Sequence, residues 1–147
     1  MIVRVGGKKA GVMEYLESGK IRGRVEKRDE IDERVILAGE HGITKAIINK
    51  MEYQKNYYHI TLSFKEDDVS REILEKIVEE AEEFFMSGFS KDEYNFYAEA
   101  HIPKMKFYYD GVGNRVERKP HIHIVVPRFN FKSMTQLKIS ENMKRDN

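Results

Sequence analysis

The sequence has 147 residues, a net charge of +1 and no cysteine, so it fits one ordinary domain and excludes disulfides and thiolate metal sites. Its apolar runs are only a few residues long, so we expect a cytoplasmic protein with no membrane segment and no signal peptide. Charge is unevenly spread: residues 66–99 carry 12 acidic and 3 basic side chains, and residues 102–147 carry 4 acidic and 10 basic ones. This asymmetry leaves room for a cationic face that binds a phosphate backbone.

In chain order, the pattern predicts a short strand at 1–5 and a short helix at 8–17, which ends before a glycine. Residues 20–34 are dense in charge and are expected to form an exposed or mobile segment. A strand is expected at 34–38 and a short amphipathic helix at 43–51.

Residues 57–64 give a better strand signal, because β-forming side chains are bounded on both sides by polar ones. The clearest helix comes next, with apolar side chains recurring at helical spacing from Val69 to Phe85. Asp68 is the predicted cap at its start, and Gly88 lies just past its end.

The last predicted element is a long β-hairpin over residues 95–128, with a turn at 110–114 and a return strand at 119–128; the tail from Phe129 shows no clear element. The order of strands and helices predicts a single α+β domain. We expect a mainly antiparallel sheet with helices packed on one face and a metal site on a central β-hairpin.

The metal site is predicted from His121 and His123, which lie two positions apart in a strand and so share one face. A regular hairpin would place His101 opposite His123, with about 5 Å between Cβ atoms. Three neutral imidazoles leave coordination positions open, as in a catalytic metal site. The alternative is a structural histidine cluster. Glu99 shares the same face, where it can orient one imidazole, and we count it among the catalytic residues.

The residues alone do not identify the nucleophile. Most of the eight tyrosines lie in expected strands, where packing is the ordinary role, whereas Tyr15 lies near the end of a short helix beside glycine-rich and arginine-rich sequence. A packing role for Tyr15 beside Val12 and Leu16 is the alternative.

The segment 58–64, the long helix after it, His101 and the His121/His123 pair together resemble the relaxase and mobilisation-nuclease family, within the endonucleases that carry a His-hydrophobic-His (HUH) motif. Residues 11–16 are similar to the family's early tyrosine motif, and residues 34–39 are similar to the family segment after that motif. The likeness covers most of residues 10–128. The tyrosine comes first and the histidines last, which favours relaxases over rolling-circle initiators and related transposases.

The resemblance implies an endonuclease that nicks single-stranded DNA at a specific site, for mobilisation or conjugative transfer of a plasmid or other mobile element. It implies Tyr15 as the nucleophile and His101, His121 and His123 as ligands of a divalent metal, Mg²⁺ or Mn²⁺. Accessory mobilisation proteins would be further partners. The expected DNA contacts are Arg22, Arg24, Arg28, Lys119 and Arg128.

Two features depart from the family pattern. The interval from His101 to His121 is longer than expected, and the chain ends soon after the metal strand, whereas such domains usually continue. Residues 1–147 are therefore expected to form one relaxase-like nicking domain, truncated at its C-terminus.

Two other functions stay open at this point. One is a non-catalytic DNA-binding relaxase remnant. The other is a metal-independent phosphoesterase with paired His motifs, in which residues 59–62 would be one half and residues 121–123 the other. His59 is expected beside the site rather than among its ligands, and His41 is expected in a charged loop without a role.

Overall fold

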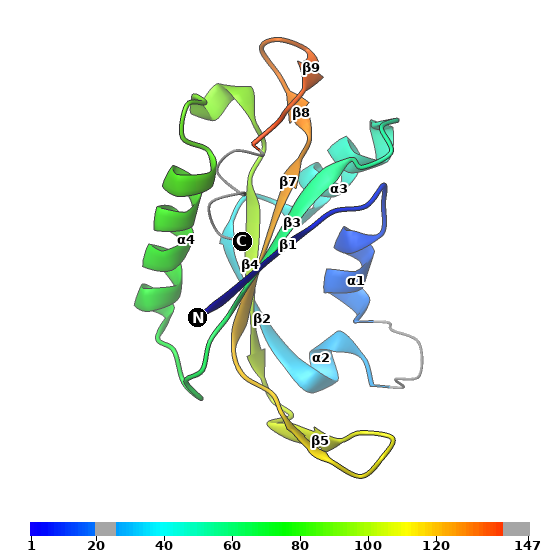
Figure 1. Cartoon of the computed structure of the whole chain (residues 1–147), viewed down its shortest axis with the longest axis vertical. Coiled ribbons are helices and arrows are strands. Elements are labelled where there is room, and N and C mark those ends of the chain that lie inside the picture. Colours follow the sequence, from blue (N-terminus) through cyan, green and yellow to red (C-terminus); the bar gives the residue numbers. More distant parts are fainter. Residues whose placement is uncertain (20–25, 140–147) are drawn as a thin grey trace.

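The computed structural model describes residues 1–19 and 26–139, and its main element is a five-stranded antiparallel sheet with the order β1-β3-β7-β4-β2 (Figure 1). These strands are β1 (Ile2–Gly6), β2 (Asp32–Ala38), β3 (Tyr57–Ser63), β4 (Tyr97–Pro103) and β7 (His121–Pro127). The helices of the described residues are α1 (Val12–Ser18), α2 (Arg28–Ile31), α3 (His41–Lys50), α4 (Arg71–Phe85) and a 3₁₀ turn, Lys91–Glu93. Two small ribbons pair β5 (Phe107–Tyr109) with β6 (Arg115–Glu117), and β8 (Phe129–Asn130) with β9 (Thr135–Gln136).

Helices cover both faces of the sheet, with α4 on one side and α1, α2 and α3 on the other (Figure 1). On the α4 side, Leu74 and Val78 pack in one apolar cluster with Ile122 and Ile124 of β7. On the other side, α1 and α3 pack in a second cluster with Tyr97 and Val125. The single α+β domain with a mainly antiparallel sheet is confirmed, but the expectation of helices on one face only is wrong. Because the central strand β7 buries the side chains of both its faces, each face needs a covering layer.

Helix α4 forms where the apolar periodicity predicts it, and it buries Leu74, Val78 and Phe85. Its cap differs from the expected one: the side chain of Ser70, not Asp68, accepts a hydrogen bond from the backbone N–H of Ile73 at 3.3 Å. Gly88 lies past the helix end with a φ of 91°. Its left-handed backbone suits a glycine at this position.

The pairing of β4 with β7 places His101 opposite His121 and Glu99 opposite His123, so the expected pairing of His101 with His123 is wrong by two residues. The error arises because the hairpin is not regular beyond Pro103. There the backbone N–H groups of Lys104 and Met105 bond to the carbonyl of Ile31, and the chain continues into the separate β5–β6 ribbon. A shift of two residues keeps every side chain on its face, so the grouping of the histidines is unaffected.

Two segments are more ordered than expected. Within the charge-rich segment, α2 forms at Arg28–Ile31 and buries both of its end residues. In the tail, β8 and β9 form a ribbon, and Leu137 and Ile139 beyond it are buried in the α4-side cluster. Ile139 is fixed there by a hydrogen bond from its backbone N–H to the hydroxyl of Tyr58, at 3.2 Å.

Candidate active site

Three histidines meet on the sheet face that α1 and α3 cover. His101 comes from β4, and His121 and His123 come from β7; their ring centroids lie 4.6 to 5.1 Å apart. Each ring offers a nitrogen atom, and these atoms all lie within 4.8 Å of one another. The three side chains are therefore close enough to share one metal ion, as the hairpin pattern predicts.

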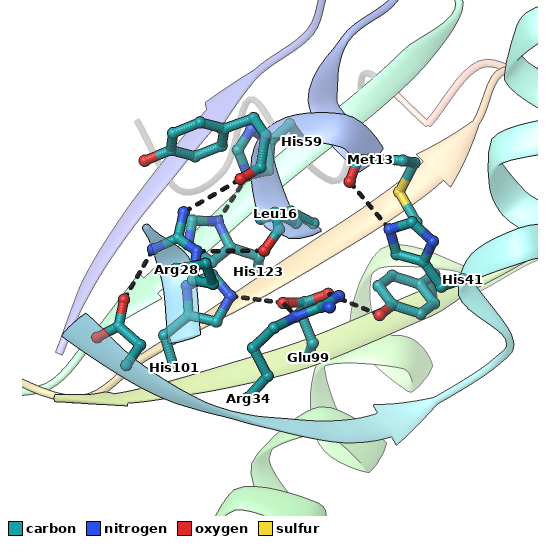
Figure 2. Close-up of polar contacts among 12 residues, drawn as sticks. Met13, Leu16, Arg28, Arg34, His41, His59, Glu99, His101 and His123 are labelled. Carbon is teal, nitrogen blue, oxygen red and sulfur yellow. Dashed lines mark hydrogen bonds and ion pairs between the residues drawn. The ribbon is translucent and has the colours of Figure 1, made fainter. Parts of the chain in front are cut away.

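Each of these rings has one nitrogen held by a partner outside the cluster. Nε2 of His101 lies 2.5 Å from Oε2 of Glu99, and Nδ1 of His121 lies 3.1 Å from the carbonyl oxygen of Lys119. Nδ1 of His123 lies 2.8 Å from Nε2 of His59 (Figure 2). Outer partners of this kind fix the orientation and the tautomer of metal-bound imidazoles.

The other ring nitrogens fit a cation. Nδ1 of His101 and Nε2 of His123 are buried and have no hydrogen-bond partner among the described residues. A buried polar atom without a partner is costly unless something else binds it. Burial also lowers the pKa of His121 to about 4 and holds those of His101 and His123 below the ordinary value of 6.5. Neutral rings keep the lone pairs that a metal requires.

Glu99 is a buried carboxylate in a network that sequence reasoning found only in part. Arg34 donates to both of its oxygens, at 2.9 and 2.7 Å, and the hydroxyl of Tyr97 donates to Oε1 at 2.6 Å (Figure 2 labels Arg34 and Glu99). Burial alone would raise the pKa of Glu99, but the hydrogen bonds from Arg34, His101 and Tyr97 together lower it to about 2. Glu99 therefore stays charged against His101.

Tyr15 lies on α1, half-buried, and lines a cavity of about 490 Å³. Tyr57, His59 and the glycine-rich segment before α1 line the same cavity. Since His59 contacts His123, this cavity adjoins the histidine cluster. The guanidinium of Arg28 lies 5.0 Å from the centre of the Tyr15 ring.

Comparison with known proteins identifies the family of this chain. The family model of the relaxase, MobA/VirD2-like, nuclease domain matches residues 37–147. The chain belongs to the MobA/VirD2-like relaxase nuclease-domain family. Cryptic plasmid protein C of Neisseria gonorrhoeae is 35% identical over 86 residues, which are 58% of this chain and 38% of that protein. The chain thus spans well under half the length of this curated relative, and no solved structure matches it.

The relaxase match includes the three histidines, Glu99 and His59, but it begins after α1. The expectation that Tyr15 is the nucleophile therefore depends on the resemblance of residues 11–16 to the family's tyrosine motif and on the cavity that Tyr15 shares with His59. Among the described residues of this relaxase domain, no helix has both the length and the apolar composition needed to cross a membrane.

The expected DNA contacts of the relaxase domain have different environments. Arg22 and Arg24 lie outside the described residues. Arg28 is 2% exposed and bonds to Asp32 at 2.7 Å and to the carbonyl of Leu16 at 3.1 Å. The expectation that Arg28 is a surface DNA contact is thus wrong, because its guanidinium joins α1 to β2 inside the domain (Figure 2).

Lys119 and Arg128 lie at opposite ends of β7. The side chain of Lys119 pairs with Asp67, and its backbone carbonyl oxygen lies 3.1 Å from Nδ1 of His121, so its backbone adjoins the histidine cluster. Arg128 stacks on the ring of Tyr58, with its guanidinium carbon 4.0 Å from the ring centre. Because Tyr58 belongs to the α4-side cluster, Arg128 is placed away from the histidine face.

Sequence reasoning missed two further residues around the site, Tyr97 and Arg34, and it assigned His41 to the wrong element. Tyr97 could have been found, because Tyr97, Glu99 and His101 alternate along one strand and share a face. Arg34 could not, because its contact depends on the pairing of β2 with β4 across 65 residues. His41 is at the start of α3 rather than in a loop, and its Nε2 lies 2.9 Å from the carbonyl oxygen of Met13 (Figure 2).

Proposed function

We propose that this domain nicks single-stranded DNA at a specific site by metal-dependent tyrosine transesterification, in the mobilisation or conjugative transfer of a mobile element. The observation that carries the proposal is the histidine cluster: three imidazoles are each held on one nitrogen, and two of the inner nitrogens are buried without a partner among the described residues. Membership of the relaxase nuclease family supports DNA as the substrate.

In the proposed reaction, the phenolic oxygen of Tyr15 attacks the scissile phosphorus. The new bond joins tyrosine to the 5′-phosphate, and the bond from phosphorus to the 3′-oxygen breaks. The phenol loses one proton and the released 3′-oxygen gains one, so the step is balanced and reversible. A divalent ion, Mg²⁺ or Mn²⁺, held by His101, His121 and His123 would supply charge neutralisation at the phosphoryl oxygens.

Other residues of the chain hold this arrangement in place. Glu99 orients His101, His59 orients His123, and the carbonyl of Lys119 orients His121. Tyr15 and His59 line the same cavity, which supports Tyr15 as the nucleophile, because the first requirement for a nucleophile is that it can reach the phosphate.

The test is a Tyr15→Phe variant incubated with Mn²⁺ and single-stranded DNA carrying candidate nick sites. Denaturing gels read out cleavage and the covalent protein–DNA adduct. The variant keeps the ring and its packing but lacks the attacking oxygen, so we expect no adduct and nearly unchanged metal and DNA binding. A Tyr53→Phe variant, altered at another partly buried tyrosine, should form the adduct at the normal rate. Adduct formation by Tyr15→Phe would reject Tyr15 and direct the search to Tyr108 and Tyr109.

Adding a chelator distinguishes the proposed function from the two alternative functions. Nicking by the wild-type protein that survives chelation would favour the paired-His phosphoesterase. DNA binding without any adduct, and with no response to the chelator, would favour the non-catalytic remnant.

A further inference from the structure

The interval between the metal-site strands contains a ribbon with three consecutive exposed aromatic side chains. In β5, Phe107 is 40%, Tyr108 44% and Tyr109 64% exposed. The ribbon has only two short strands and projects from one end of the main sheet, close to α2 (Figure 1). Adjacent exposed aromatic rings lose the benefit of burial, so such a patch on a protein surface points to a binding surface.

Two of these rings form one face of the ribbon together with an arginine. Phe107 and Tyr109 are two residues apart in a strand and so lie on the same face, with their ring centroids 5.9 Å apart. Arg115 pairs with Tyr109 across the ribbon, and its guanidinium carbon lies 3.9 Å from the centre of the Phe107 ring. Aromatic rings and an arginine plane on one surface are the groups on which unpaired nucleobases stack. Tyr108 points to the other face of the ribbon.

The base of the ribbon is fixed to the domain. Arg118 donates to the carbonyls of Ile31 and Met105, at 2.9 and 3.0 Å, and to Asp32 at 3.0 Å. Lys104 donates to the carbonyl of Asp29 at 2.8 Å. These bonds tie the ribbon to α2 and β2, so its stacking face has a defined position relative to the histidines.

Position and charge both suit a nucleic acid. Phe107 comes six residues after His101 and Arg115 six residues before His121, so the ribbon begins within about 20 Å of extended chain from the metal site. The positive charge lies at the base of the ribbon: residues 104–106 and 118–119 carry 4 basic and no acidic side chains, whereas residues 107–117 carry 1 basic and 2 acidic ones. Basic side chains at the base of the ribbon, between the stacking face and the proposed cleavage site, can contact the phosphates of a bound strand.

We infer that the β5–β6 ribbon binds the single-stranded DNA beside the scissile phosphate, with bases stacked on Phe107 and Tyr109. The inference rests on the proposed function, since it names the element that holds that substrate. It requires a single strand, because duplex bases are stacked on each other and their faces are closed to side chains.

The first experiment uses the absence of tryptophan from the sequence. A Phe107→Trp variant carries one tryptophan in the stacking face, and a Val112→Trp variant carries one in the turn, at a site that is 81% exposed. Thirty-nucleotide single strands, added with a chelator, should quench the Phe107→Trp fluorescence to saturation and that of Val112→Trp far less. Equal quenching of both variants, or equal quenching by duplex, would overturn the inference. If the Phe107→Trp fluorescence is quenched as the protein concentration rises without any DNA, the ribbon mediates self-association, and this result would also overturn the inference.

The second experiment measures affinity by fluorescence anisotropy. A Phe107→Ala/Tyr109→Ala variant should bind single strands at least roughly tenfold more weakly, the effect of losing base–aromatic stacking, and should bind duplex as the wild type does. Tyr108→Ala, which removes an exposed ring from the other face, should bind normally. Circular dichroism confirms that each variant is folded. A wild-type domain that binds no single strand would reject the proposed function, whereas unchanged binding by the double variant would reject the ribbon alone.

Discussion

Nε2 of His59 lies 2.8 Å from Nδ1 of His123, and the two rings are stacked with 27° between their planes. If His123 binds a cation through Nε2, its Nδ1 carries the proton and donates it to His59. His59 must then be neutral to accept, and burial lowers its pKa to about 4, which favours that form. His59 is thus a positioning residue for one of the metal ligands.

We predict that His59→Ala weakens Mn²⁺ binding by about 10- to 100-fold, the usual effect of removing an outer partner from a metal ligand. His59→Gln should retain more affinity, because its amide oxygen can accept the same hydrogen bond. Calorimetric titration measures both, with the His121→Ala/His123→Ala variant as the background for a lost site. His41→Ala, a matched histidine change that contacts none of the three, should bind normally. Equal affinity in His59→Ala and wild type would show that His123 needs no such partner.

A second prediction concerns stability. Glu99→Gln removes the charge that Arg34, Tyr97 and His101 bind in the interior. The carboxylate of Glu99 is fully buried, and the side chain of Arg34 is 26% exposed. Because breaking this partly buried pair leaves the Arg34 charge without its partner but still in contact with solvent, we expect a loss of about 2 kcal/mol in the free energy of unfolding. Urea denaturation measures it. Glu75→Gln breaks an exposed Arg71–Glu75 pair and should cost well under about 1 kcal/mol. A similar small loss in both variants would contradict a structural role for the Glu99 network.

The sequence predicts the site better than it predicts the surroundings of the site. Alternation of side chains along β7 predicts that His121 and His123 share a face, and the helical spacing of apolar residues along α4 predicts its buried face. Both patterns are local in the sequence. The burial of Arg28 and the Arg34–Glu99 pair depend on how distant segments meet, which no local period contains. Strands of two residues, such as β8 and β9, are too short to show any alternation at all.

A third prediction concerns pH. Burial would raise the pKa of Asp32, but hydrogen bonds from Arg118 and Arg28 outweigh it and hold the pKa below 3.8. A carboxyl whose pKa is lower in the folded state stabilises the fold above its unfolded pKa, and this contribution disappears as the pH falls through the folded pKa. Asp32→Asn should therefore be less stable than wild type at neutral pH, with a difference that narrows below pH 3.8.

Thermal melts of both proteins between neutral pH and about pH 3 test the Asp32 prediction. Asp67→Asn is the control, because its pair with Lys119 is exposed and solvent screens it, so the change should be smaller. A wild-type advantage over Asp32→Asn that stays constant down to the lowest pH would mean that the charge of Asp32 is not what stabilises the fold.

The last prediction is the salt dependence of DNA binding. Each phosphate that a basic side chain neutralises releases counterions, and for a single strand it adds about 0.7 to the steepness of log affinity against log salt. Four such contacts would weaken binding roughly fifty-fold between about 50 and 200 mM salt. Lys119, two residues before His121 in the sequence, should be one of them, so Lys119→Ala should weaken binding at low salt and reduce the slope. Lys76→Ala, on the acidic helix α4 across the sheet, should leave both unchanged. Anisotropy titrations over this range measure the slope, and an affinity that does not vary with salt would rule out a surface that follows the phosphates.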